Sequence, residues 1–302
     1  MKIVILAGGD SLERRISLIS GKTVFNALKE KYKVCMLDPS KKNFIKKFLS
    51  EKPDFVFIAL HGGKGENGII QGFLETLNLP YTGASVLSSA ICMNKIVSKR
   101  LLLSYNIPTP DFIEITGLEP EIPFGYPVVV KPANGGSTIG ISIVESKKDL
   151  KKAIRKAWTV DKEYFIEKFI KGTEITIGIL GNEKLKILPL IEIRTKRKFY
   201  DWTEKYTKGE SIHIIPPQVP EKILQKAEDI AMKTYKILKC KGFARMEMII
   251  DKKGKCWVLD INTIPGLTNI SLFPDAAKHA GISFLQLCEK LIQLGIEKCG
   301  KN

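Results

Sequence analysis

Cysteine is scarce in this chain and never stands in a metal-binding or disulfide-rich pattern. Six cysteines are spread over 302 residues, with no C-x-x-C pair and none near a histidine at zinc-finger spacing. A chain this long and this poor in cysteine does not depend on a disulfide scaffold. Reduced thiols in a cytoplasmic protein are therefore the expected state.

Long apolar runs are also missing. No segment approaches the roughly 20 apolar residues that a membrane-spanning helix needs. The first apolar stretch, residues 3–7, ends at Gly8-Gly9-Asp10, which makes it too short for a signal peptide and typical of a buried strand. Because internal repeats and low-complexity tracts are absent too, we expect a soluble protein of two or three domains.

Acidic residues are outnumbered by basic ones. The chain has 48 Lys and Arg against 32 Asp and Glu, a formal net charge of +16. This excess indicates an anionic partner without identifying it, since nucleic acid, membrane headgroups and polyphosphate metabolites all fit. With 44% hydrophobic and 26% charged residues, the composition excludes a disordered or collagen-like chain.

The first 83 residues alternate between strand and helix signals. Strands are expected at residues 3–7, 34–37 and 55–60, and helices at 16–28 and 43–49. The run at 55–60 is apolar throughout, as in a parallel strand that is covered on both faces. The pattern predicts a small doubly wound α/β domain, which binds ligands in the loops at its strand carboxyl ends, here 8–13 and 61–68.

The rest of the chain predicts two further regions that mix helices and strands, so that we expect domains at 1–83, 84–167 and 168–302. Strands are expected at 128–131, 141–144, 175–180, 187–193, 243–250 and 256–261, and the third region starts around 165–169. Helices are expected at 90–104, 147–156 and 221–239.

A glycine-rich loop joins the strands at 128–131 and 141–144. The backbone amides at Gly135, Gly136 and Gly140, with the hydroxyls of Ser137 and Thr138, can surround phosphate oxygens. It is not a Walker loop, because Gly-Lys-Ser/Thr is absent and a strand follows where a helix should. A phosphate cover is the functional interpretation, supported by the preceding Lys131, and a plain hairpin tip is the alternative.

The last predicted hairpin, 243–261, carries a polar face. A four-residue loop at 251–254 would place Arg245 opposite Asp260 and Glu247 opposite Val258. Alternation along the strands then puts Arg245, Glu247, Asp260 and Asn262 on one face and Met246, Met248, Leu259 and Ile261 on the other. Three oxygen ligands and a guanidinium suit hard cations held against phosphates. An exposed face with cross-strand ion pairs is the alternative.

The stretch from 194 to 209 is too long for an incidental connection. It interleaves basic residues with aromatic ones, among them Lys205 and Tyr206. Such a composition fits single-stranded nucleic acid or a lid that closes over a nucleotide. His61 stands at a predicted strand end, where it could face a ligand, although a lone histidine in a loop is more often structural.

These motifs, in this order, resemble the D-alanine–D-alanine ligases of the ATP-grasp superfamily, over residues 3–291. The matching motifs are Gly8-Gly9-x-Ser11-x-Glu13-Arg14, His61-Gly62, Lys131-Pro132-x-x-x-Gly136-Ser137-x-x-Gly140, Tyr200-Asp201, Lys205-Tyr206, Gly242-x-x-Arg245 and Asn262-Thr263-x-Pro265-Gly266. The resemblance implies an ATP-grasp fold with an N-terminal Rossmann-like domain and two α+β domains that hold ATP between them. In the family, ATP phosphorylates the carboxylate of one D-alanine, and the amine of a second D-alanine displaces phosphate to give the dipeptide of peptidoglycan.

The resemblance also implies roles for individual residues on the amino-acid side of the site. Glu13 would hold the ammonium of the first D-alanine, aided by a link from Ser137 to Tyr206, and His61 would line the same pocket. Arg245 and the Gly266 amide would stabilise the tetrahedral oxyanion. Ser271 and Leu272 would receive the carboxylate of the second D-alanine.

On the nucleotide side, the implied ligands of ATP are Lys95, Lys131, Gly136, Ser137, Glu167, Lys168, Ile170, Glu174 and the lid residue Lys205. Lys95 and Lys131 match phosphate positions, and residues 167–174 match adenine and ribose positions. Glu247, Asp260 and Asn262 would hold two Mg²⁺ ions, with Mn²⁺ as the alternative. The family also leads us to expect a homodimer.

Two departures from the family pattern concern these ligands. Glu247 and Asp260 exchange the usual aspartate and glutamate, and Asn134-Gly135 replaces a common Arg-Glu pair in the glycine loop. A ligase that joins D-alanine to D-lactate or D-serine is one alternative. Tyr206 argues against the D-lactate version, because the resemblance links this tyrosine to dipeptide formation. A basic nucleic-acid-binding protein is the other, and it leaves Glu13 and the polar hairpin face unexplained.

Overall fold

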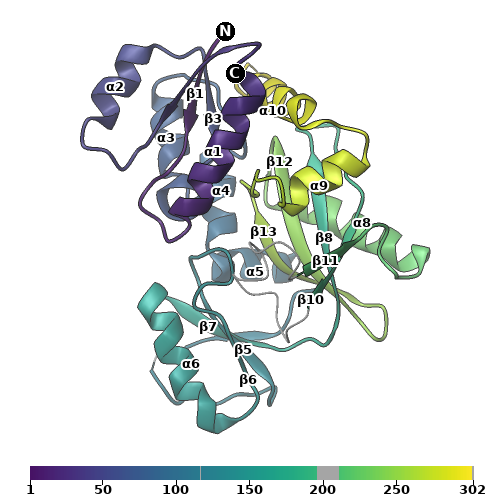
Figure 1. Cartoon of the computed structure of the whole chain (residues 1–302). Helices are drawn as coiled ribbons and strands as arrows, with labels where there is room; N and C mark the ends of the chain where they lie inside the picture. The colour runs from purple at the N-terminus through teal and green to yellow at the C-terminus, as the bar shows by residue number, and fades with distance from the viewer. Residues whose placement is uncertain (116, 196–210, 301–302) are drawn as a thin grey trace.

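The computed structural model describes residues 1–115, 117–195 and 211–300. Three β-sheets lie one after another along this part of the chain (Figure 1). Each falls in one of the three predicted domain ranges, except that the last strand of the second sheet ends at Lys168. The domain boundaries themselves stay a prediction.

The first sheet is three-stranded and parallel, in the order β2-β1-β3. Its elements are β1 (Lys2–Leu6), α1 (Arg14–Leu28), β2 (Lys33–Leu37), α2 (Phe44–Glu51), β3 (Phe55–Ile58), the 3-10 turn η1 (Gly63–Gly65) and α3 (Ile69–Thr76). Every residue of β3 is buried, which confirms the expectation of a strand that is covered on both faces. Helix α1 buries Ile16, Ser20, Val24 and Leu28, one face at four-residue spacing.

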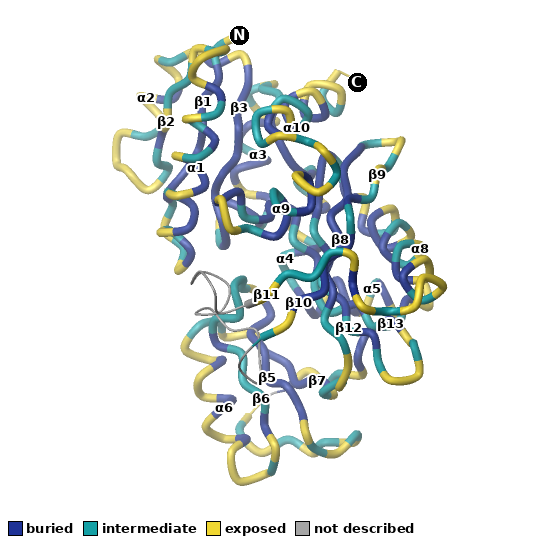
Figure 2. Tube along the Cα trace, turned by 45° about the vertical axis from the view of Figure 1, so that its right-hand side comes forward, coloured by how far each residue is buried: buried dark blue, intermediate teal, exposed yellow. Residues whose placement is uncertain are grey.

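The second sheet is four-stranded and antiparallel, in the order β4-β7-β5-β6. Its elements are β4 (Phe112–Glu114), β5 (Val128–Pro132), β6 (Ser142–Val144), α6 (Lys147–Val160) and β7 (Tyr164–Lys168). Helix α6 packs Leu150 and Ile154 against Val130 of β5, and its lysine-rich face is exposed (Figure 2).

Two helices occupy the segment in which one helix was expected over residues 90–104. They are α4 (Val86–Met93) and α5 (Lys95–Ser104). Asn94 separates them with an extended backbone, and its side chain accepts a hydrogen bond of 3.0 Å from the Val97 amide. Asparagine is a favoured N-cap, so the second helix begins here with its own cap.

The third sheet has six strands in antiparallel order, β11-β10-β8-β12-β13 with β9 beside β8. Its elements are β8 (Gly172–Leu180), β9 (Lys186–Ile187), β10 (Ile191–Thr195), β11 (Ser211–Ile214), α8 (Glu221–Ile237), β12 (Phe243–Asp251) and β13 (Cys256–Asn262). The single strand expected over 187–193 is two strands, because Pro189 between them has no amide to donate to a ladder.

The hairpin of β12 and β13 differs in register from the prediction. Its turn leaves three residues, 252–254, between Asp251 and Lys255, and Gly254 adopts a left-handed conformation with φ of 76°. Ile250 therefore pairs with Cys256 rather than with Lys255. A β-bulge shifts the register again between Glu247 and Met248. As a result, Arg245 lies opposite Asn262 and Glu247 lies opposite Asp260.

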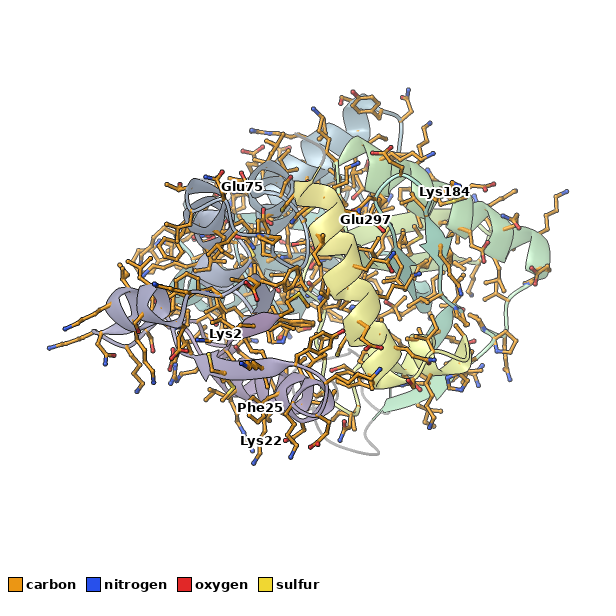
Figure 3. All side chains as sticks on the ribbon, turned by 90° about the horizontal axis from the view of Figure 1, so that it is seen from above. Lys2, Lys22, Phe25, Glu75, Lys184 and Glu297 are labelled. Atoms are coloured by element: carbon orange, nitrogen blue, oxygen red, sulfur yellow. The ribbon has the colours of Figure 1, made fainter. Side chains whose placement is uncertain are left out.

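The chain ends with α9 (Leu272–His279) and α10 (Phe284–Cys299), of which α10 returns to the first sheet. Leu287, Leu291 and Ile292 share a core with the residues of β1 and β3. Seen from above, α10 lies between the helices around the first sheet and the six-stranded sheet (Figure 3). Among the described helices, none has the length and apolar character needed to cross a membrane.

Candidate active site

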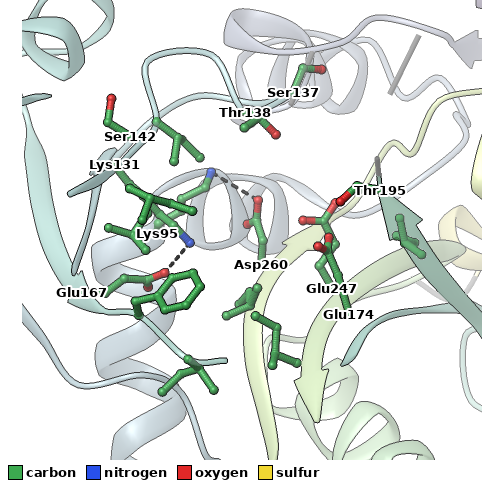
Figure 4. Close-up of a pocket in the computed structure, with 18 of the residues that line it drawn as sticks. Lys95, Lys131, Ser137, Thr138, Ser142, Glu167, Glu174, Thr195, Glu247 and Asp260 are labelled. Carbon is green, nitrogen blue, oxygen red and sulfur yellow. Dashed lines mark ion pairs between the residues drawn. The ribbon is translucent and has the colours of Figure 1, made fainter. Parts of the chain in front are cut away.

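A cavity of about 990 Å³ opens between the four-stranded and the six-stranded sheets. Its walls come from β5, β6 and β7 on one side and from β8, β10, β12 and β13 on the other, with the glycine-rich loop at its edge (Figure 4). Twelve predicted site residues line it: Lys95, Lys131, Gly136, Ser137, Glu167, Lys168, Ile170, Glu174, Arg245, Glu247, Asp260 and Asn262. Residues distant in sequence thus share one cavity.

Two buried lysines face this cavity from different elements. The Lys95 ammonium, at the start of α5, donates a 2.5 Å hydrogen bond to the carbonyl of Gly135 and lies 3.4 Å from Asp260 Oδ2. Lys131, on β5, forms an ion pair with Glu167 of β7 (Figure 4). Burial would raise the pKa of Glu167, but the ammonium groups of Lys131 and Lys99 lower it below its ordinary value. Glu167 is therefore an anion.

The hairpin places its polar residues on the cavity side. The predicted common face of Arg245, Glu247, Asp260 and Asn262 is confirmed, since all four line the cavity. The Arg245 guanidinium lies 2.7 Å from Glu247 Oε1. Leu259, predicted for the apolar back, lines the cavity instead, and Val258 takes its place in the core. The bulge explains this change, because it turns both Leu259 and Asp260 toward the cavity.

The donor set of this face fits magnesium. The described residues contain no group of three or more His, Cys, Asp or Glu that could hold a metal by themselves. Two carboxylates and one amide oxygen are nevertheless the kind of partial set that Mg²⁺ uses when substrate phosphates complete its coordination. Lys95 and Arg245 now lie against the same carboxylates, so both anions already attract positive charge.

A second set of predicted residues meets where the glycine-rich loop touches the first sheet. Glu13, 7% exposed, stands at the N-terminus of α1, and the Ser137 hydroxyl donates a hydrogen bond to its carboxylate. Ser137 and Thr138 both have positive φ, at 52° and 65°. Such strain in non-glycine residues is concentrated at functional sites. A Cβ on Gly136 would lie 2.4 Å from Glu13 Oε2, so the loop approaches Glu13 as closely as only glycine allows.

The loop that bears Glu13 is anchored on both sides. Arg14 donates 2.6 Å hydrogen bonds to the Gly9 carbonyl and to Asp38 at the end of β2. Burial would raise the pKa of Asp38, but its hydrogen bonds to Arg14 and to backbone amides lower it well below its ordinary value. The charged pair therefore holds Glu13 in place from the carboxyl ends of the parallel strands.

His61 is 4% exposed, and both of its ring nitrogens have protein partners. Nε2 lies 2.9 Å from the Ser20 hydroxyl, and Nδ1 lies 3.1 Å from the carbonyl of Ile264. Because that carbonyl can only accept, Nδ1 carries the proton. The Leu267 amide donates to the same Ser20 hydroxyl at 3.3 Å. This bridge ties the loop around Gly266 to α1, and the predicted contact of His61 with D-alanine stays a prediction.

Gly266, Ser271 and Leu272 lie together at the N-terminus of α9. A Cβ on Gly266 would lie 2.8 Å from Ser271 Oγ, and Leu272 is buried. The Ser271 hydroxyl lies 2.7 Å from that of Thr268. Backbone amides at a helix start suit an anionic group such as a carboxylate.

Four residues remain to be compared with the sequence prediction: two that were predicted but are not described, and two that were not predicted. Lys205 and Tyr206, with most of the expected lid, lie outside the described residues. Lys99 and Ser20 were not expected to take part. The only sequence signal for Lys99 is its position one helical turn after Lys95, and for Ser20 its place on the buried face of α1.

Known proteins share this architecture over the whole chain. Residues 115–293 match the family model "D-ala D-ala ligase C-terminus", and residues 41–84 match "D-ala D-ala ligase N-terminus". The chain is 47% identical to a D-alanine–D-alanine ligase of Carboxydothermus hydrogenoformans, covering 98% of this chain and 99% of that one. It is 45% identical to that of Moorella thermoacetica, covering 98% and 100%. The crystal structure of the Bacillus anthracis D-alanine–D-alanine ligase complexed with ATP superposes with a TM-score of 0.86 at 35% identity, covering 99% and 98%.

A cavity between two antiparallel sheets that is lined by lysines and carboxylates, together with the superposition on a ligase complexed with ATP, shows an ATP-grasp fold. Within that class, the match over nearly the full length decides the family. The chain belongs to the D-alanine–D-alanine ligases.

Proposed function

We propose that this protein joins two D-alanine molecules to D-alanyl-D-alanine in an ATP-dependent reaction that supplies peptidoglycan synthesis. The observation that carries the proposal is the meeting of the glycine-rich loop with Glu13. This contact brings a buried carboxylate, suited to an ammonium group, next to the cavity that suits a nucleotide. An amino acid and ATP can therefore be held side by side.

The nucleotide is proposed to occupy the cavity. Lys95 and Lys131 would bind its phosphates, and Gly136 and Ser137 would cover them. Glu167, Lys168, Ile170 and Glu174, which line the same cavity, would bind adenine and ribose. Glu247, Asp260 and Asn262 would hold Mg²⁺, or Mn²⁺, which offsets phosphate charge when bound.

The chemistry is proposed to run in two steps. Glu13 would hold the ammonium of the first D-alanine, and the carboxylate of that molecule attacks the γ-phosphate of ATP to form an acyl phosphate with release of ADP. The amine of the second D-alanine attacks the acyl carbon, and phosphate leaves. Arg245 and the Gly266 amide would stabilise the oxyanion between attack and departure. Ser271 and Leu272 would orient the second substrate through its carboxylate.

The test is a phosphate-release assay with ATP, Mg²⁺ and D-alanine. We expect release that depends on D-alanine, with L-alanine inactive, and D-alanyl-D-alanine as the product by mass spectrometry. Added D-lactate or D-serine should not give a mixed product in preference to the dipeptide. Release that is independent of D-alanine would contradict the proposal.

Three accompanying expectations belong to the same proposal. The protein acts in the cytoplasm as a homodimer, its substrates are D-alanine and ATP, and it binds neither nucleic acid nor membrane. Light scattering at assay concentration measures the oligomeric state. Salt-sensitive binding to a random oligonucleotide would contradict the expectation that the protein binds no nucleic acid.

A further inference from the structure

Lys99 is a buried charge behind the cavity. It lies on α5, its residue is 1% exposed, and it is not among the residues that line the cavity. Its ammonium donates hydrogen bonds of 2.6 Å to the Thr109 hydroxyl and 3.0 Å to Glu167 Oε2. Lysine is almost never fully buried without a partner, because taking its charge out of water is costly. The burial of Lys99 therefore requires interactions that stabilise its charge.

Glu167 connects Lys99 to the cavity. One carboxylate oxygen pairs with Lys131, which lines the cavity, and the other pairs with Lys99, which lies behind it. The side chains of Lys99 and Glu167 are each 2% exposed and that of Lys131 is 8% exposed, so water screens these charges little. The three groups together carry two positive charges and one negative charge.

The net charge of this cluster depends on Lys99. With Lys99 present, the anion is shared between two cations and one positive charge is left over beside the cavity. Without it, Lys131 and Glu167 would form a neutral pair, and an anionic ligand would have to compete with Glu167 for the Lys131 ammonium. Because the cluster is buried, water and salt screen this difference less than they would at the surface, and a phosphate in the cavity experiences it.

The pKa directions agree with three charged groups. Burial lowers the pKa of Lys99, and the charge of Glu167 opposes that effect. Burial would also lower the pKa of Lys131, but Glu167 raises it above its ordinary value. Lys131 therefore keeps its charge in the closed interior.

We propose that Lys99 is a positioning residue for the nucleotide: it balances the charge of Glu167 and so leaves the ammonium of Lys131 to a phosphate group. The inference rests on the proposed function, since it takes the ligand to be ATP or ADP. It assigns α5 two tasks one turn apart, because Lys95 reaches the cavity directly and Lys99 acts through Glu167.

The test compares two variants by calorimetric binding of ADP with Mg²⁺ and by thermal unfolding. Lys99→Gln removes the charge and keeps hydrogen-bonding capacity, and should weaken ADP binding about tenfold. Thr109→Val is the matched control, because it removes a hydrogen bond of Lys99 and keeps every charge. It should lower the melting temperature and change the ADP affinity by less than about twofold.

A third variant distinguishes charge balance from packing. Lys99→Arg keeps the positive charge beside Glu167 and changes the shape of the side chain, so ADP affinity should stay within about threefold of wild type. This variant also keeps the test open if Lys99→Gln is too unstable to purify. A purified Lys99→Arg variant that binds ADP more than tenfold more weakly than wild type would overturn the inference.

Two further outcomes separate this inference from the proposed function. Wild-type protein that binds ADP, with unchanged affinity in Lys99→Gln, would overturn the role of Lys99 alone. Wild-type protein that does not bind ADP would overturn the proposed function and this inference with it.

Discussion

Replacing Gly136 by alanine should damage the first amino-acid site more than the nucleotide cavity, although Gly136 lines that cavity too. A Cβ at this position would lie 2.4 Å from Glu13 Oε2 and 2.9 Å from both Cδ and Oε1. The shortest of these is about 1 Å below an ordinary van der Waals separation. Either the loop or the buried Glu13 must therefore move, and the hydrogen bond from Ser137 to Glu13 joins the two.

The size of the effect follows from the contact that is lost. A hydrogen bond to a charged group contributes about 1.5–3 kcal/mol, which corresponds to roughly 10- to 150-fold in an equilibrium. We expect Gly136→Ala to raise the KM for D-alanine at the first site within that range. The KM for ATP should rise less than the KM for D-alanine, because Gly136 is only part of the proposed phosphate cover and the lysines and carboxylates of the cavity come from other elements.

Gly135→Ala is the matched control for the same loop. The added Cβ would meet nothing closer than 3.9 Å, and Gly135 has no positive φ. It should change the KM for D-alanine by less than about twofold in the phosphate-release assay. Equal KM values for D-alanine in the two variants would refute the reasoning, as would a rise in the KM for ATP alone in Gly136→Ala.

Three further predictions concern other parts of the molecule. Asp260→Asn removes one anionic ligand at constant shape, so phosphate release should fall at least 100-fold while thermal unfolding is little changed, and near-normal turnover at ordinary Mg²⁺ would exclude the metal site. Ser20→Ala removes the bridge between His61 and the Leu267 amide, so kcat should fall with little change in the KM for ATP. Ser20→Thr keeps the hydroxyl and should recover part of the lost kcat. An unchanged kcat in Ser20→Ala would show that this bridge does not position the Gly266 loop. Burial lowers the pKa of Lys298 to about 7. Between about pH 7 and the ordinary pKa range of lysine, the folded protein therefore binds fewer protons than the unfolded chain. Because the unfolded chain binds more protons there, the stability of the fold should rise with pH over this range. In Lys298→Met that rise should be smaller between pH 7 and 10, and identical pH profiles of the melting temperature would contradict the assignment.

Local patterns were enough to predict most elements. The apolar runs of β1 and β3 and the spacing on α1 and α8 are properties of neighbouring residues, so they can be read without the fold. Helix α10 was not predicted, although its start carries a local signal, the capping box of Ser283 and Gln286, and its buried Leu287 and Leu291 have helical spacing. The break at Asn94 was missed because residues 90–104 are compatible with one continuous helix, and only the cap separates two.

The candidate site divides in the same way. Motif residues such as Glu13, Ser137 and Lys131 could be named from the sequence because they match a family pattern. Lys99 and Ser20 could not, because their roles depend on partners 68 and 247 positions away, Glu167 and Leu267. A lysine on a helix is usually solvated, and only the packing of α5 against β7 makes this one a buried counter-charge.

The hairpin shows why a wrong register can still give the right face. A three-residue turn shifted the pairing by one position relative to the prediction, and the bulge between Glu247 and Met248 shifted it by one more. Alternate residues of one strand keep a common face whatever their pairing with the neighbouring strand. The predicted common faces of Arg245 with Glu247, and of Asp260 with Asn262, were therefore correct despite the wrong register. The predicted face of Leu259 was wrong, because the alternation of side chains is interrupted at the bulge. The bulge thus adds the apolar side chain of Leu259 to the cavity wall beside Asp260, next to the carboxylates proposed to bind metal.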